Sequence, residues 1–185
     1  ARRVRFYRDC RALAMRRMRS IFLLLALGVL WLFPEWFGLS GRPTRTVEGA
    51  TVIVRDGDTL SAAGQDYRLH GIDAPELTQT CKTASGSDWA CGKDARTALV
   101  ALVKVRTLNC QERARDKFRR IVATCIDDRG EDIARAMIDR GLAVSFGGFA
   151  DGPYASDEAI AKGKRHGLWQ GTFEAPSSWR ATHPR

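Results

Sequence analysis

A basic segment followed by an apolar run is the feature that most limits what this chain can fold into. Residues 1–20 are rich in arginine, and residues 21–33 form a run of 13 apolar residues. This order is typical of an export signal. Counted through residue 39, the stretch has 19 residues, close to the roughly 20 that a membrane-spanning helix needs, with Pro34 and Glu35 near its outer edge.

We favour an uncleaved signal anchor over residues 21–39, with a cleaved signal peptide as the alternative. In both cases the arginines are expected to stay on the cytoplasmic side. The chain beyond residue 40 is then exported, either to the periplasmic side of the inner membrane or into the medium. Residues 1–40 form a leader, so residues 41–185 provide at most 145 residues, enough for one globular domain.

The net charge of +9 lies mostly in this leader. Residues 1–40 contain eight arginines against Asp9 and Glu35, a net of +6, which leaves +3 for the other 145 residues. The total charge is therefore weak support for nucleic-acid binding by the folded domain. Such a function has to rest on a local cluster of residues.

Patterning predicts an α+β domain over residues 51–185, after a polar linker at 41–50. Short runs rich in β-branched residues alternate with turn residues and predict five strands, at 51–54, 59–62, 67–72, 103–111 and 121–127. Apolar residues at helical spacing predict three helices, at 93–102, 131–140 and 156–166. We expect a five-stranded OB-fold β-barrel packed with three α-helices, with an open sheet as the alternative.

Four cysteines lie in the exported part, and their even number favours two disulfides. No C-x-x-C pair is present, which argues against a structural zinc site. Four cysteines allow three connectivities. Cys110 and Cys125 flank a charged turn and can face each other across a hairpin, which would leave Cys81 to pair with Cys91. The register of the strands decides between the connectivities.

Three charged clusters carry the chemistry. They are the DGDT turn at 56–59, the segment RLHGIDAPE at 68–76, and the run RARDKFRR at 113–120. Each alone is an ordinary turn or a solvated hairpin. Together they offer carboxylates for Ca²⁺ or Mg²⁺, a glutamate that can act as a base, and arginines that can donate to phosphate. These are the parts of a metal-assisted phosphodiesterase.

In this order the clusters resemble the staphylococcal nuclease (thermonuclease) family, from about Val52 to Arg180. The segment RGLA at 140–143 and the tail GLWQGTFEAPSSWR at 167–180 extend the resemblance. The resemblance implies an OB barrel with three helices. It also implies Ca²⁺-dependent hydrolysis of DNA and RNA that leaves 3′-phosphates.

The resemblance also implies a role for each matching residue. The Ca²⁺ ligands fall on the carboxylates of Asp58 and Asp73 and on the main-chain carbonyl of Ala74. The general base falls on Glu76. The arginines that hold the phosphate fall on Arg68 and Arg120.

Substrate contacts are carried over less directly. Lys117 matches a position that reaches a terminal phosphate. The best-known family member has tyrosines after the second helix that stack on the nucleoside, and here the aromatic residues of that stretch are Phe146, Phe149 and Tyr154. We expect these three side chains either to stack on bases or to belong to the core.

The function expected from these residues is that of an exported, monomeric, Ca²⁺-dependent nuclease acting on DNA and RNA. Two alternatives remain. One is a binding module of the same fold that holds nucleic acid or another polyanion without cutting it. The other is a membrane-tethered accessory protein with a role in the cell envelope or its polysaccharides.

Overall fold

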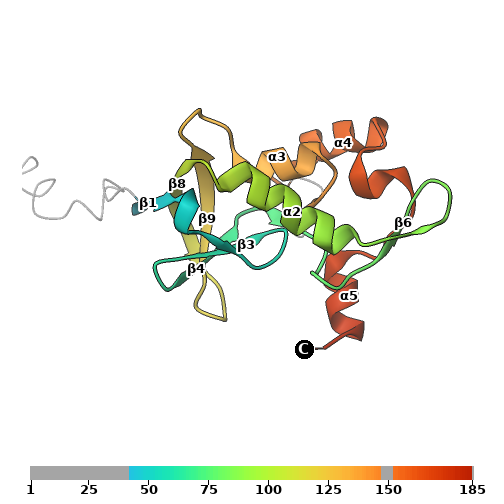
Figure 1. The fold of residues 1–185 in the computed structure, drawn as a ribbon, viewed down its shortest axis with the longest axis horizontal. Coiled ribbons are helices and arrows are strands. Elements are labelled where there is room, and N and C mark those ends of the chain that lie inside the picture. Colours follow the sequence, from blue (N-terminus) through green and yellow to red (C-terminus); the bar gives the residue numbers. More distant parts are fainter. Residues whose placement is uncertain (1–41, 147–151, 185) are drawn as a thin grey trace, which may run out of the picture. The chain divides into compact units, whose positions relative to one another are not determined.

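The structure is a computed structural model that describes residues 42–146 and 152–184 (Figure 1). The predicted leader at 1–40, with the anchor at 21–39, lies outside the described residues. Within the described ranges, no helix is both long enough and apolar enough to cross a membrane.

A six-stranded mixed sheet forms the centre of the fold. Its order is β1 (Thr44–Glu48), β8 (Thr107–Arg115), β9 (Ile121–Asp127), β4 (Gln65–Leu69), β3 (Thr59–Ala62) and β2 (Ile53–Val54). The β4–β9 pair is parallel and the other pairs are antiparallel. Two small antiparallel pairs accompany it: β5 (Ile72–Asp73) with β10 (Val144–Ser145), and β6 (Cys81–Lys82) with β7 (Asp88–Trp89).

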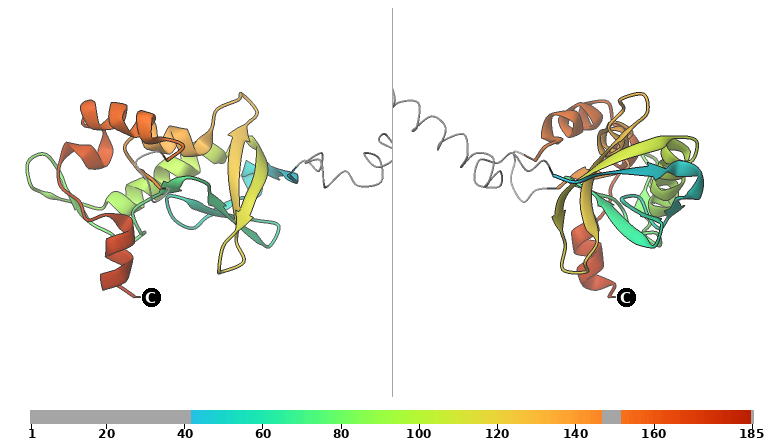
Figure 2. Two further views of the ribbon diagram at one scale, coloured as in Figure 1. Left: turned by 180° about the vertical axis from the view of Figure 1, so that it is seen from behind. Right: turned by 90° about the vertical axis from the view of Figure 1, so that its left-hand side faces the viewer.

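Four α-helices occur in the described residues, together with two short 3-10 helices at Gly49–Thr51 and Gly167–Gln170. The α-helices are α2 (Cys91–Val103), α3 (Ile133–Asp139), α4 (Ala155–Gly163) and α5 (Pro176–Thr182). Helix α3 packs against α2, α4 and β9. Both views of Figure 2 show α5 apart from α3 and α4, running toward the C-terminus.

The α+β class is confirmed, but the predicted numbers of elements were too low. The sheet has six strands instead of five, and α5 is a fourth helix. Helix α5 begins with proline at its first position, a favourable helix start, but buries only Pro176. It therefore lacks the apolar periodicity by which a helix is found in sequence.

The linker predicted at 41–50 was wrong over residues 44–48, which form β1. This strand pairs with β8 along its whole length, from Thr44 opposite Gln111 to Glu48 opposite Thr107. Only Val47 of the strand is buried. A strand that buries only one side chain has the sequence pattern of a polar linker. Its stability comes from main-chain pairing, which leaves no pattern in the sequence.

Helix α2 and the turn before β3 pack closely, and this contact positions the first charged cluster. The helix buries Ala95, Leu99 and Leu102 in the core, at the spacing of one helical face. A Cβ atom at Gly57 would lie 2.7 Å from the Ala74 Cβ and 2.8 Å from the Ala95 Cβ. Glycine at 57 therefore lets the DGDT turn approach α2.

The preferred disulfide connectivity is confirmed. Cys110 on β8 lies directly opposite Cys125 on β9 and is bonded to it. The second disulfide joins Cys81 in β6 to Cys91 at the start of α2. One bridge therefore joins two neighbouring strands of the central sheet, and the other ties the segment after Glu76 to a helix.

We expect the double variant Cys110→Ala/Cys125→Ala to lower the free energy of unfolding by about 3 kcal/mol, because opening a loop of this size restores entropy to the unfolded chain. Both cysteines are buried in the core, so part of the loss comes from packing. Urea denaturation of the oxidised wild type and of the variant measures the difference. Equal midpoints would contradict the prediction.

Candidate active site

Strand register brings the three charged clusters together. Thr59 on β3 lies opposite Arg68 on β4, and the parallel β4–β9 pair places Tyr67 beside Ile121. Arg120 immediately precedes Ile121, and Asp58 immediately precedes Thr59. Asp58 and Arg120, which are 62 positions apart in the sequence, thus lie at the ends of two strands that both pair with β4.

Arg68 bridges two buried carboxylates. Its Nη1 donates to Oδ1 of Asp58 at 2.8 Å, and its Nη2 donates to Oδ1 of Asp73 at 2.7 Å. Asp58 is 2% exposed and Asp73 is 1% exposed. Two carboxylates shielded from water therefore share one guanidinium, and an oxygen of Asp58 and an oxygen of Asp73 both point toward it.

Asp58 is held by further hydrogen bonds. The Ala74 main-chain N–H donates to its Oδ2 at 3.1 Å, and the Thr59 hydroxyl donates to its Oδ1 at 2.9 Å. Burial raises the pKa of Asp58 to about 7, although the charge of Arg68 acts in the opposite direction. A buried carboxylate of this kind gains from an additional cation beside it.

Asp116 orients Arg120. The Nε atom of Arg120 donates to Oδ2 of Asp116 at 2.7 Å, and its Nη1 lies 3.4 Å from the Thr59 hydroxyl oxygen. Oδ1 of Asp116 accepts main-chain N–H bonds from Phe118 and Arg120. The sequence pattern predicted no role for Asp116, although an aspartate that accepts from the second residue after it is a common turn signal.

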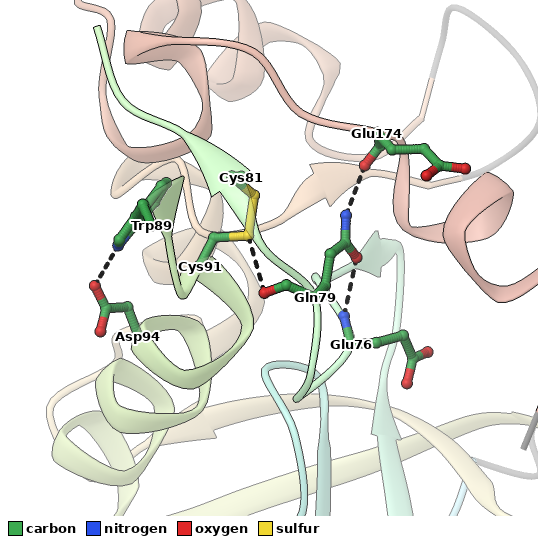
Figure 3. The surroundings of a disulfide bond; sticks show 7 residues. All are labelled: Glu76, Gln79, Cys81, Trp89, Cys91, Asp94 and Glu174. Carbon is green, nitrogen blue, oxygen red and sulfur yellow. Dashed lines mark hydrogen bonds between the residues drawn. A yellow bond between two sulfur atoms is a disulfide. The ribbon is translucent and has the colours of Figure 1, made fainter. Parts of the chain in front are cut away.

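Glu76 lies on a segment that is fixed from several sides (Figure 3). Its main-chain N–H donates to Oε1 of Gln79 at 3.2 Å, and Nε2 of Gln79 donates to the Glu174 carbonyl at 2.7 Å. Gln79 is 1% exposed. A Cβ atom at Gly92 would lie 1.8 Å from the Glu76 carbonyl oxygen, so the start of α2 packs directly on this segment.

Arg180 on α5 reaches the same carboxylates. Its Nη1 and Nη2 donate to Oδ1 and Oδ2 of Asp73 at 2.8 and 2.9 Å, and Nη1 lies 3.3 Å from Oε1 of Glu76. The hydrogen bonds to Asp73 raise the pKa of the Arg180 guanidinium above its ordinary value. Arg180 ends the tail that resembles the family, and its sequence pattern predicted no role for it.

The substrate-contact candidates are not alike. Phe146 is 50% exposed, and Lys117 lies at the β8–β9 turn with its Nζ 5.1 Å from the Phe118 ring centre. Phe149 lies outside the described residues. Tyr154 is 4% exposed and donates its hydroxyl to Asp132 at 2.9 Å. The expectation that Tyr154 could stack on a base is therefore corrected, because its ring is part of the core.

The chemistry of the donor set fits Ca²⁺. Asp58 and Asp73 supply hard carboxylate oxygens that already converge on one cation, the Arg68 guanidinium. In the part of the chain that the structure describes, no three His, Cys, Asp or Glu side chains gather closely enough to hold a metal. A main-chain carbonyl such as that of Ala74, water and substrate oxygens would have to complete the coordination.

Comparison with known proteins gives a family and several relatives. Residues 66–171, more than half of the chain, match the family described as "Staphylococcal nuclease homologue". The succinoglycan biosynthesis protein ExoI of Rhizobium meliloti (strain 1021) is 38% identical over 132 residues, which cover 71% of this chain and 68% of that protein.

Two eukaryotic relatives are more distant. The probable staphylococcal-like nuclease CAN4 of Oryza sativa subsp. japonica is 32% identical over 126 residues, covering 67% of this chain and 23% of that protein. The probable endonuclease lcl3 of Aspergillus flavus is 29% identical over 162 residues, which cover 78% of this chain and 55% of that protein. The alignments thus span less than two thirds of these two relatives.

We expect Gln79→Ala to lower the free energy of unfolding by about 1–3 kcal/mol, because the Glu76 N–H and the Glu174 carbonyl would lose their partner. Chemical denaturation measures the loss. Gln111→Ala, on a partly exposed position of β8, is the matched control and should change the stability little. Equal losses in the two variants would contradict the prediction.

We expect the stabilising effect of Asp116 to depend on pH. Although burial alone would raise its pKa, hydrogen bonds from Arg120 hold the pKa of Asp116 below its ordinary value of 3.8. A carboxylate with a lowered folded-state pKa stabilises the fold above its unfolded pKa, and this stabilisation is lost as the pH falls through the folded value.

Asp116→Asn should therefore be less stable than the wild type at neutral pH. The difference in the free energy of unfolding between the two proteins should shrink as the pH falls below 3.8. Denaturation curves at several pH values measure it, with the exposed Asp128→Asn as the control. A gap that stays constant with pH would show that the charge of Asp116 is not its cause.

Proposed function

We propose that this protein, which belongs to the staphylococcal nuclease family, is an exported Ca²⁺-dependent nuclease that hydrolyses DNA and RNA to give 3′-phosphate ends. The observation that carries the proposal is the Arg68 guanidinium bridging the buried carboxylates of Asp58 and Asp73. A buried, converging arrangement of this kind is costly for the fold, and sites of catalysis are where such arrangements concentrate. Family membership implies an OB-fold for the β-rich part.

Calcium would be held by the carboxylates of Asp58 and Asp73 and by the main-chain carbonyl of Ala74. When bound, it would offset the negative charge that a phosphodiester gains as its phosphorus becomes five-coordinate. The raised pKa of Asp58 and its two further hydrogen bonds support this assignment, because they describe a carboxylate that is buried and fixed in orientation.

The protein's own side chains would carry the remaining chemistry. Glu76 would orient the attacking water and accept its proton. Arg68 and Arg120 would donate hydrogen bonds to phosphate oxygens, and these bonds strengthen as the charge develops. The new bond would join the water oxygen to phosphorus, and the bond from phosphorus to the 5′ oxygen would break. The 5′ oxygen would take a proton from solvent and leave as a hydroxyl, and the phosphate would stay on the 3′ side.

Substrate binding would rely on phosphate contacts, which are common to DNA and RNA. We propose that Lys117 reaches a terminal phosphate and that Phe146 offers an exposed ring for stacking. Phe118 is 67% exposed on the same turn as Lys117 and is a further candidate, which the sequence analysis missed. Tyr154 has no place in this proposal.

Export is proposed from the basic and apolar leader at 1–40, which would anchor the protein to the periplasmic side of the membrane or be removed. The two disulfides support an oxidising location. We propose a monomer, with residues 51–185 as the nuclease part and β1 added to it by pairing with β8.

A second candidate function follows from the relative named for succinoglycan biosynthesis. On this alternative the protein would have an accessory role in making the polysaccharides of the cell envelope, or would bind a polyanion without cleaving it. Asp58, Asp73, Glu76, Arg68 and Arg120 are all present, which favours the nuclease.

The test is cleavage of single- and double-stranded DNA and RNA by the full chain, with Ca²⁺ or with a chelator. We expect cleavage only with Ca²⁺, and a loss of about 100-fold or more in Glu76→Gln and in Arg120→Ala, because each change removes a group that acts on the transition state. Glu131→Gln and Arg129→Ala, on a surface turn, are the matched controls.

Cleavage that persists with chelator, or that survives in Glu76→Gln, would overturn the assigned chemistry. A folded wild type that cuts none of the four substrates would favour the binding or polysaccharide alternatives.

A further inference from the structure

Both oxygens of Asp73 already accept hydrogen bonds from guanidinium groups. Arg68 donates only to Oδ1, at 2.7 Å. Arg180 donates to Oδ1 and, among the described residues, is the one side chain that donates to Oδ2. Any cation that binds Asp73 must therefore share an oxygen with Arg180 or replace Arg180 at that oxygen.

Arg180 comes from a short helix that buries little of its own surface. Helix α5 has seven residues and buries only Pro176. The Arg180 side chain is 37% exposed, whereas Arg68 is 17% exposed. Contacts that water can reach open at low cost, so the α5 contact is easier to open than the Arg68 bridge.

We propose that Arg180 is a built-in competitor for the metal ion at Asp73, so that helix α5 sets the Ca²⁺ affinity of the site. The inference rests on the Ca²⁺ site proposed above. Oδ1 of Asp73 already accepts from Arg68 and Arg180, and Oδ2 accepts from Arg180, so Ca²⁺ would bring a further positive charge to oxygens that are already in use. Like charges a few ångströms apart repel each other. Binding of Ca²⁺ therefore requires Arg180 to leave at least one Asp73 oxygen.

The same exchange affects Glu76. Nη1 of Arg180, which donates to Asp73, also lies 3.3 Å from Oε1 of Glu76. If Ca²⁺ displaces Nη1 from Asp73, the contact of Nη1 with Glu76 is expected to open with it. Arrival of the metal would release an oxygen of the proposed base from Arg180, which couples metal binding to assembly of the site.

Linkage gives the size and the sign of the effect. If Ca²⁺ binds only when Arg180 has left Asp73, the apparent affinity is lowered by the fraction of molecules in which it has left. Removing the guanidinium removes this penalty. By reciprocity, saturation with Ca²⁺ must weaken the attachment of α5 to the same degree.

The experiment is calorimetric titration of the full chain with Ca²⁺, comparing the wild type with Arg180→Gln. We expect about tenfold tighter binding in the variant, corresponding to a site that is open in roughly a tenth of wild-type molecules. Arg180→Lys should fall between the two, because an ammonium group cannot donate to both oxygens in the fork geometry. Arg165→Gln, which removes the same charge near the end of α4, should bind like the wild type.

Hydrogen exchange gives a second measurement that does not depend on activity. Main-chain amides of residues 176–182 should exchange faster when the wild type is saturated with Ca²⁺. Equal or weaker Ca²⁺ binding in Arg180→Gln, or slower exchange of α5 with Ca²⁺, would overturn the inference and leave the Ca²⁺ site standing. Absence of Ca²⁺ binding from both proteins would overturn the Ca²⁺ site and the inference with it.

Discussion

The bridge from Arg68 to Asp58 and Asp73 is the interaction on which the rest of the site depends. Two carboxylates that are almost fully buried would repel each other and would each pay a large desolvation cost if no cation stood between them. Arg68 lies on a strand, so its position is set by the sheet rather than by a loop. The orientation of both carboxylates follows from that of Arg68, and the surrounding hydrogen bonds refine it.

The parallel pairing of β4 with β9 is what makes this arrangement possible. The parallel register places Tyr67 opposite Ile121 and Arg68 opposite Val122, and Thr59 lies opposite Arg68 on the other neighbouring strand. Asp116 then fixes the direction of Arg120 through a turn that closes on its own main chain. The sheet thus fixes the position of Arg68, and the turn around Asp116 fixes that of Arg120.

The sequence predicts the parts of the site that belong to regular elements and misses those that depend on tertiary contact. Strands near 59–62 and 121–127 and three of the helices follow from β-branched runs and helical periodicity. Gln79 reads as a loop residue, yet it is buried because it joins the main chain at Glu76 to that at Glu174. Strand β1 and helix α5 each bury a single residue of their own, so patterning gives no sign of either.

The matched family segment at 66–171 does not contain the whole site. Asp58 precedes that segment and Arg180 follows it, and both act on the carboxylates or the arginine within it. Three carboxylates, from Asp58, Asp73 and Glu76, face Arg68 and Arg180, so the charge around the site depends on a helix that contributes little to the core. A relative that keeps Asp58 and the matched segment but has a different tail would keep the Arg68 bridge, while its carboxylates would face a different set of positive charges. On the Ca²⁺ site proposed above, relatives that share Asp58 and Asp73 but differ in the tail would therefore differ in their Ca²⁺ affinity.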